Sequence, residues 1–171
     1  MKNLARLAAV AAATTIIATP AFAAPVGVTG QVPTASVRIV KPLTLTRVRD
    51  LNFGTIVVGA VVGTQTVQVT DAGALAGCNT NGVTCQNNGV QSARYNVTGT
   101  NNQLVNIAAS TSNLTSGGNT LVFTPNWATN TVTLTSSGTP GNNFDLGGSI
   151  DLTASTPEGL YTGNLIVTVD Y

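Results

Sequence analysis

Residues 159–171 have the sequence Gly-Leu-Tyr-Thr-Gly-Asn-Leu-Ile-Val-Thr-Val-Asp-Tyr and end in an alternation of apolar and polar side chains. One face carries Leu165, Val167, Val169 and Tyr171, and the other carries Asn164, Thr168 and Asp170, with Ile166 as the exception. This period of two predicts a half-buried β-strand. Because the sequence ends on this strand, we expect either an earlier segment or another molecule to cover its open edge.

Short segments with strand composition recur through the rest of the chain, separated by turn sequences. Residues 35–45 alternate around a kink at Lys41-Pro42, and residues 51–59 form a run rich in β-branched side chains. Further strands are predicted at residues 63–70, 93–98, 104–107, 121–124, 132–134 and 144–154, whereas residues 71–89 are rich in turn residues. About nine short strands with turns between them predict an all-β fold, an immunoglobulin-like antiparallel β-sandwich.

The first 23 residues have the layout of a secretory signal peptide. Lys2 and Arg6 provide a charged start, residues 7–17 an apolar run, and residues 21–23, Ala-Phe-Ala, a cleavage site. We expect cleavage after Ala23 or one residue later, and hence export from the cytoplasm. The alternative, a membrane-spanning helix, requires about 20 unbroken apolar residues, and threonines and a proline interrupt this segment.

The exported chain is nearly neutral and poor in charge. Removal of 23 of the 171 residues leaves 148, which is enough for one domain, with five basic and six acidic side chains. Such a chain has no basic patch for nucleic acid or an anionic membrane. Charged residues make up only 8% of the full sequence, and Thr, Ser, Asn and Gly carry the polarity instead. This composition favours a secreted structural protein over an enzyme.

The chain contains two cysteines, Cys78 and Cys85, within a segment rich in Gly, Asn and Thr. An even number of cysteines in an exported chain predicts a disulfide, here one that closes a short turn-rich loop. The alternatives are a metal site and a redox pair. A metal site needs more Cys or His ligands, and the sequence has no His; redox motifs have a tighter spacing.

The sequence offers few residues for chemistry. The absence of His excludes Ser-His-Asp and Cys-His catalysis. Asp145 and Asp151 could pair as carboxylates for glycoside hydrolysis, with Glu158 nearby, but they are better explained as solvated turn or strand-edge residues. Tyr95 and Trp127 could stack on a carbohydrate, although packing in the core is the simpler use. We therefore predict no catalytic, metal or cofactor site.

The segment that follows the cleavage site, residues 24–34, allows two interpretations. Val26, Val28 and Val32 share one parity, which is typical of an extended strand with one apolar face. Pro25 and Pro33 bracket the segment, and small or polar residues separate the valines, which is equally typical of a disordered terminus.

The C-terminal residues resemble the pilin subunits of bacterial chaperone-usher systems, in particular the archaic class with spore-coat-U-like domains. Those subunits have a Gly-x-Tyr turn before a final Thr/Val strand that ends on an aromatic residue, here Gly159, Tyr161 and residues 165–171. Residues 41–45 and 51–55 are also similar to a domain family of unknown function, common in secreted proteobacterial proteins and related to fimbrial subunits. The resemblance extends over nearly all of residues 24–171.

The resemblance implies donor-strand complementation, in which each subunit is an incomplete sandwich completed by the N-terminal strand of another subunit. The donor would be residues 24–33 with Val26, Val28 and Val32, and an extension of the donor into Ala35, Val37 and Ile39 stays open. One edge of the acceptor groove would be Leu165, Val167, Val169 and Tyr171, and the other would be residues 35–45.

The function implied is that of a structural subunit of a surface pilus or fimbria. Its partners would be copies of itself, a periplasmic chaperone and an outer-membrane usher, with no nucleic acid and no small-molecule substrate. Residues 1–23 would be the signal peptide, 24–34 the N-terminal extension and 35–171 the pilin-like domain. The alternative is a monomeric secreted binding or matrix-adhesion module whose N-terminal segment folds back on its own sheet.

Overall fold

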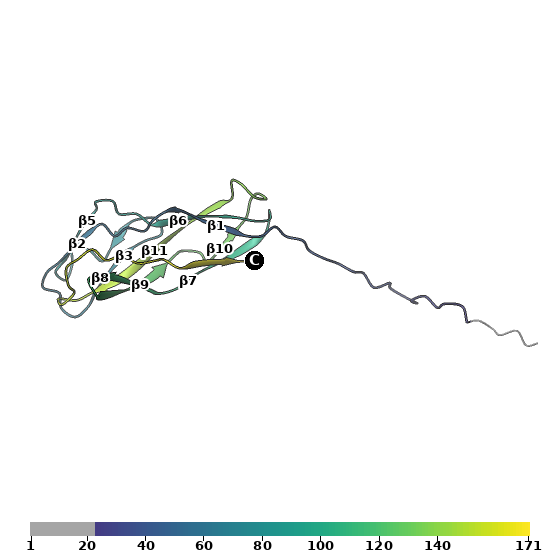
Figure 1. Cartoon of the computed structure of the whole chain (residues 1–171), viewed down its shortest axis with the longest axis horizontal. Coiled ribbons are helices and arrows are strands. Elements are labelled where there is room, and N and C mark those ends of the chain that lie inside the picture. Colours follow the sequence, from purple (N-terminus) through teal and green to yellow (C-terminus); the bar gives the residue numbers. More distant parts are fainter. Residues whose placement is uncertain (1–22) are drawn as a thin grey trace, which may run out of the picture. The chain divides into compact units, whose positions relative to one another are not determined.

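The computed structural model describes residues 23–171, and all regular structure in this part of the chain is β-strand (Figure 1). The predicted signal peptide falls almost entirely on residues 1–22, outside the described residues. Residues 38–171 form one unit, called the domain below, and the residues before it belong to a second unit. We call residues 23–37 the arm. No helix of the described residues is long and apolar enough to cross a membrane.

Twelve strands make up the domain, and every pairing between them is antiparallel. They are β1 (Thr44–Arg49), β2 (Thr55–Val58), β3 (Gln65–Val69), β4 (Leu75–Ala76), β5 (Val83–Gln86), β6 (Ala93–Thr98), β7 (Leu104–Ala109), β8 (Ser112–Ser116), β9 (Asn119–Asn126), β10 (Thr131–Thr133), β11 (Asn142–Leu152) and β12 (Val167–Asp170). The predicted all-β antiparallel fold is confirmed.

The strands form three sheets. The large sheet has the order β1-β6-β11-β3-β4, with β9 also paired to β11 and β8 to β9. The second sheet is β10-β7-β12, and the third is the pair β2-β5. Val97 of β6 and Val105 of β7 share one buried cluster with Leu134, so the large and second sheets pack face to face as in a sandwich.

Strand β11 organises the large sheet because it has eleven residues and changes partners along its length. Its first half pairs with β6, from Asn142 opposite Val97 to Leu146 opposite Ala93. Its second half pairs with β9 and β3. Gly147 lies at the point where β11 changes partners. A Cβ added there would lie 2.1 Å from the Val69 carbonyl oxygen. Glycine therefore lets three strands approach at one point and lets the sheet curl.

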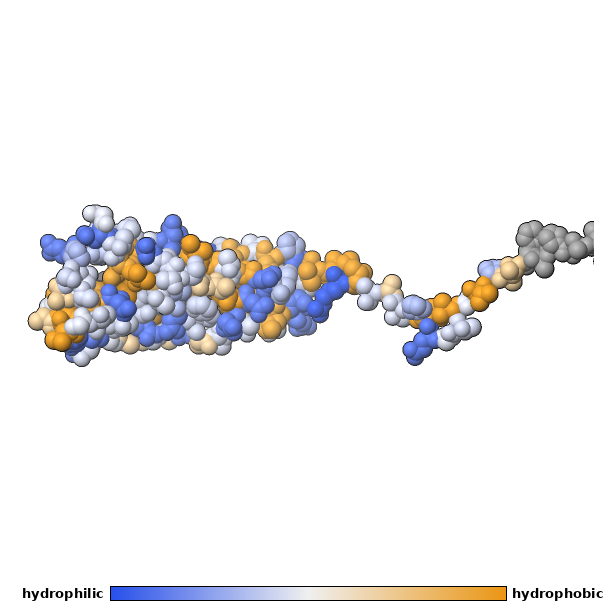
Figure 2. All heavy atoms as spheres, turned by 90° about the horizontal axis from the view of Figure 1, so that it is seen from below, coloured by the Kyte–Doolittle hydropathy of each residue, from blue (hydrophilic) through white to orange (hydrophobic). Residues whose placement is uncertain are grey.

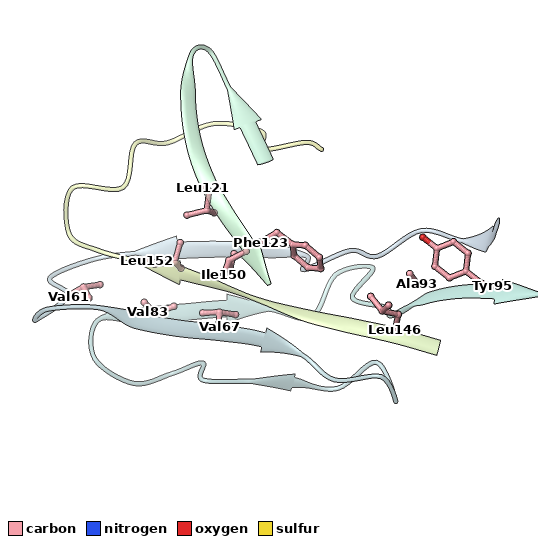
Figure 3. Close-up of a cluster of buried hydrophobic side chains, with 10 residues drawn as sticks. All are labelled: Val61, Val67, Val83, Ala93, Tyr95, Leu121, Phe123, Leu146, Ile150 and Leu152. Atoms are coloured by element: carbon pink, nitrogen blue, oxygen red, sulfur yellow. The ribbon is translucent and has the colours of Figure 1, made fainter. Parts of the chain in front are cut away.

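The main core lies on the inner side of the large sheet. Figure 3 shows Leu121 and Phe123 of β9 beside Ile150 and Leu152 of β11, with Tyr95 farther along the sheet on β6. Phe123 has 2% of its surface exposed, and its ring meets Phe53 edge to face at 6.3 Å. The edge-on contact is the arrangement that aromatic quadrupoles favour.

Most predicted strands are present, and three differences have physical explanations. The strand predicted at residues 35–45 is wrong before Thr44, where no strand is present. Val37 and Ile39 are more than 80% exposed. Nothing in the described chain pairs with them, and prolines stand at positions 33 and 42. Strand β8 was not predicted since Ser, Asn and Thr dominate it. The turn-rich segment 71–89 also contains the short strands β4 and β5.

The predicted disulfide between Cys78 and Cys85 is confirmed, with 5.5 Å between the two Cα atoms. Cys85 lies on β5 and is paired with Ile56 of β2. The cross-link therefore fastens the loop after β4 to the strand that supports β2.

Replacing both cysteines by serine is expected to lower the free energy of unfolding by about 2.5 kcal/mol, the loop-closure value for a ring of about eight residues. Thermal unfolding of the double variant, followed by circular dichroism, measures this as a fall in Tm. Reduction of the wild-type protein should produce the same fall and should not change the Tm of the variant. If neither the double substitution nor reduction of the wild-type protein lowered the Tm, the stabilising role of the cross-link would be contradicted.

Candidate functional site

The domain has a groove of about 1000 Å³ between two segments that are far apart in sequence. One wall is formed by residues 47–58, which run from β1 to β2, and the other by residues 156–165, which lead into β12. We call this hollow the apolar groove. Side chains of the large sheet form its floor: Ala93, Tyr95, Leu121, Phe123, Ile150 and Leu152.

The floor of the apolar groove is the hydrophobic core itself. The floor residues all belong to the buried cluster of Figure 3. Around them, Leu51, Phe53, Ile56, Leu114 and Leu165 pack against that cluster and are only partly buried. Complete burial of each such side chain beneath an added strand would contribute about 1.5–3 kcal/mol.

The two walls present strand edges with hydrogen-bonding capacity. Within residues 23–171, β1 is paired on one edge only, with β6, and β12 on one edge only, with β7. The segment before β12 also forms backbone hydrogen bonds with the chain that follows β7. Thr162 pairs with Thr115, and the Ile166 carbonyl accepts from the Ser110 amide. The opposite edges carry backbone groups that another strand could pair with.

One polar atom on the lining is unsatisfied. Ser112 lines the groove from β8, and its hydroxyl is buried with no hydrogen-bond partner among the described residues. Leaving such a group unpaired costs about 1–3 kcal/mol. A polar group brought into the groove could remove this cost.

Charge on the rim is unevenly balanced. Arg47 donates to both oxygens of Asp50, at 2.6 and 2.9 Å, so these two charges offset each other on one wall. Glu158 on the other wall is exposed and forms no ion pair or hydrogen bond with the described residues. Its turn is held by the hydrogen bond from the Tyr161 hydroxyl to the Pro157 carbonyl, 2.9 Å. Arg49 also lines the groove and shares the Asp145 carboxylate with Arg94, so Glu158 is the lining acid without a partner among the described residues.

The opposite end of the C-terminal segment is fastened by Tyr171. Its hydroxyl accepts from the Thr100 amide at 2.9 Å and donates to the Lys41 carbonyl at 2.5 Å. The Lys41 amide in turn donates to the Thr100 hydroxyl at 2.6 Å. Tyr171 thus ties the start of the domain to the end of the final strand, and Lys41 lies at the end of the segment remote from Glu158.

Replacing Tyr171 by Phe should loosen this end selectively. Loss of the hydroxyl removes hydrogen bonds worth about 1 kcal/mol, so the Thr100 amide hydrogen should exchange with solvent about fivefold faster in hydrogen-exchange measurements. Tyr161→Phe is the matched control, because that hydroxyl contacts only Pro157, and it should leave Thr100 unchanged. An equal rate at Thr100 in Tyr171→Phe and wild type would show that the bridge does not restrain this end.

The arm has the exposed valines that the sequence suggested as a donor. Val26 is 91% exposed, Val28 64% and Val32 72%, and no strand is assigned to residues 23–37. Figure 2 shows apolar patches recurring along this part of the chain, and others that interrupt the polar surface of the domain. Isolated valines on a surface are ordinary, but an alternating set in an unpaired segment is a surface suited to burial.

The predicted residues of the final strand alternate as expected. Leu165, Val167 and Val169 are half buried, whereas Ile166 points outward and is exposed. Leu165 lines the apolar groove, and Val167 packs against the main core. Tyr171, placed on the same face by its parity, forms the bridge to Lys41 described above.

The second wall lies elsewhere than the sequence indicated. An edge of the acceptor groove was predicted at residues 35–45, which do not line this hollow, whereas residues 47–58 do. The alternation of Leu51 and Phe53 around Asn52 was an available signal, but it does not indicate which strand lies opposite the C-terminus. The floor residues were predicted as strand residues without any role at the site.

The carboxylates considered for catalysis have structural contacts. Asp145 binds Arg94 at 2.7 and 2.8 Å and Arg49 at 3.3 Å, across three neighbouring strands of the large sheet. The hydrogen bond and the charge of Asp145 raise the pKa of Arg94 above its ordinary value. Asp151 accepts from the Thr66 hydroxyl at 2.5 Å. In residues 23–171 no three His, Cys, Asp or Glu side chains gather as metal ligands.

The aromatic residues considered for carbohydrate binding serve the core. Tyr95 stacks on Phe144 with the ring centroids 5.5 Å apart, and it forms part of the groove floor. Burial raises the pKa of Tyr95, and the nearby Asp50 carboxylate adds to this effect. Trp127 is partly buried against the main core. Packing, the simpler of the two uses, is the one observed.

The groove-bearing domain coincides with a known sequence family. The family described as a domain of unknown function (DUF4402) matches residues 43–171. The chain is a member of the DUF4402 family. The matched residues of this DUF4402 chain include both walls and the floor of the apolar groove, and they leave the arm outside. Neither a curated protein nor a solved structure matches the chain.

Proposed function

We propose that the chain is a structural subunit of a bacterial surface pilus or fimbria and that it polymerises by donor-strand exchange. Residues 24–33 of one copy would lie in the apolar groove of another as an added strand. The observation that carries the proposal is the groove itself, a hollow of about 1000 Å³ with core side chains on its floor and polar groups on its walls, between residues 47–58 and the segment that leads into β12.

The arm has the composition that such a groove requires. In an extended strand, Val26, Val28 and Val32 would face the floor, while Thr29 and Gln31 would face solvent. The backbone of the arm would pair with the free edges of both walls, and it would bring polar groups within reach of the Ser112 hydroxyl. Backbone pairing would provide affinity, and the valines would fix the register.

In this proposal the arm lies antiparallel to the C-terminal segment. It would then run parallel to the wall of residues 47–58, because the chain leaves Lys41, beside Tyr171, toward that wall, whereas the C-terminal segment runs toward Tyr171. Since residues 159–171 run from the Glu158 end toward Tyr171, the arm would run the other way. Residue 33 would then leave the groove near Glu158.

This direction favours a second copy over the arm of the same chain. An arm in its own groove would have to return from the Glu158 end to Lys41, which Tyr171 holds at the other end. Residues 34–41 reach at most about 29 Å when fully extended. The segment 159–171 along which they must return would span about 43 Å if it were extended throughout, and β12 covers Val167–Asp170 of it. Self-insertion would therefore stretch residues 34–41, whereas a neighbouring copy has no such constraint.

Repeated insertion would join copies head to tail. A contact between two different surfaces that does not close on itself generates a filament. A free subunit would expose the groove and its strand edges, which is an aggregation hazard. The proposal therefore includes a periplasmic chaperone that covers the groove and an outer-membrane usher that assembles subunits at the cell surface, the partners that the resemblance implies.

The size distribution of the mature protein from the cell surface tests this function. In SDS without heating, the proposal expects a ladder of multimers that collapses to one band on boiling, because the inserted strands are trapped without covalent bonds. The monomer band alone before heating would contradict the proposal. It would favour the alternative, a monomeric secreted binding module.

A further inference from the structure

The described cations and acids fall into two groups according to whether they have partners. Arg47, Arg49 and Arg94 are engaged in ion pairs within the domain. Arg38 and Lys41, which directly follow the arm, are exposed and form no ion pair with any described residue. Arg49 and Arg94 share the single carboxylate of Asp145, whereas the two described cations that contact no carboxylate lie where the arm joins the domain.

The acids show a complementary pattern. Asp50 and Asp145 are in ion pairs, and Asp71, Asp151 and Asp170 accept hydrogen bonds from nearby backbone or hydroxyl groups. Glu158 has neither kind of partner within residues 23–171, although its turn is held in place at the rim of the apolar groove. An exposed carboxylate without a partner, on a turn at the mouth of a groove, can attract a cation.

We infer that Arg38 and Lys41 of one copy dock against Glu158 of the copy whose groove receives the arm. The inference rests on the proposed function and its strand direction, in which residue 33 leaves the groove near Glu158. Arg38 follows five residues later, at most about 18 Å along the chain, and its side chain is long. The donor's Arg38 can therefore reach the acceptor's carboxylate, for direct contact or, within about 8–10 Å, for attraction through solvent, and Lys41 follows three residues later.

This contact would select the direction of insertion. If the arm entered the other way, residue 33 would leave at the Tyr171 end, where the acceptor's own Lys41 lies. The donor's cations would then approach a like charge that the neighbouring Asp170 carboxylate offsets. Attraction at the Glu158 end favours the antiparallel arrangement and speeds productive encounters.

Charge reversal in the full mature chain tests the contact. Assembly is followed as the multimer fraction in unheated SDS over time, at low salt. Glu158→Arg, and separately Arg38→Glu with Lys41→Glu, should each slow assembly about three- to tenfold, the range expected for one or two exposed ion pairs. A chain with all three changes should recover to within about twofold of wild type. In 0.5 M NaCl the differences should disappear.

Asp151→Arg is the matched control, because it makes the same charge change at an exposed acid that does not line the groove. It should assemble like wild type. If the Glu158 and Arg38/Lys41 variants also assemble at the wild-type rate, the docking contact is overturned while donor-strand exchange stands. If the wild-type chain forms no multimers, the proposed function fails, and the contact fails with it.

Discussion

A carboxylate at position 28 is expected to reduce multimer formation by more than a hundredfold. In the proposed assembly, Val28 is the central inward-facing side chain of the arm and lies over a floor of buried leucine, isoleucine and aromatic side chains. An unpaired charge transferred into such surroundings costs several kcal/mol, and about 2.7 kcal/mol already corresponds to a factor of 100 in an equilibrium constant. The multimer fraction of Val28→Asp in unheated SDS measures the effect.

The neighbouring residue provides the control. Thr29→Asp adds the same charge one position along the arm, where the strand period places the side chain in solvent. Its multimer fraction should stay within a few-fold of wild type. Both variants lie outside the domain and should leave the Tm of the domain unchanged. Equal assembly by Val28→Asp and wild type would show that the valine face is not buried.

Gly147→Ala is expected to lower the free energy of unfolding by about 3 kcal/mol, the upper part of the range for overpacked sites. An added Cβ would lie 2.1 Å from the Val69 carbonyl oxygen, 2.6 Å from the Thr70 carbonyl carbon and 2.9 Å from the Asp71 amide nitrogen. These neighbours are backbone atoms at the end of β3 and in the turn that follows it, and they cannot turn away as a side chain would. Urea unfolding gives the change.

Ser149→Ala, two residues along β11, is the control for Gly147→Ala. It also changes the strand at a partly buried position, but it removes one oxygen rather than adding a carbon. A change below about 1 kcal/mol is expected. If Gly147→Ala were as stable as Ser149→Ala, the close approach of β11 to the end of β3 would be contradicted.

The sequence predicted what depends on local patterns. The alternation of Leu165, Val167 and Val169 gave the inward face of the final strand, and two cysteines in an exported, turn-rich segment gave the disulfide. Both are decided by side chains close together in sequence. The all-β fold followed in the same way, from short apolar runs separated by turns.

What the sequence did not predict depends on contacts between distant segments. Residues 35–40 have the composition of a strand, but a strand also needs a partner, and no part of the described chain pairs with them. The wall at residues 47–58 becomes part of the groove only because β1 pairs with β6 and the C-terminal segment with β7 and β8. Pairings between segments that are 40 or more residues apart in sequence cannot be predicted from the local pattern of apolar and polar residues.

Photo-crosslinking from position 28 tests the central claim most directly. A photoreactive phenylalanine analogue replaces Val28, the full mature chain is prepared in ¹⁴N and ¹⁵N forms, and the two forms are mixed before assembly and irradiated. Mass spectrometry of the linked peptides identifies both partners. Our proposal expects links between differently labelled copies, from position 28 to groove residues such as Phe123, Leu165 or Phe53. Links confined to a single copy, or links outside the groove, would contradict donor-strand exchange.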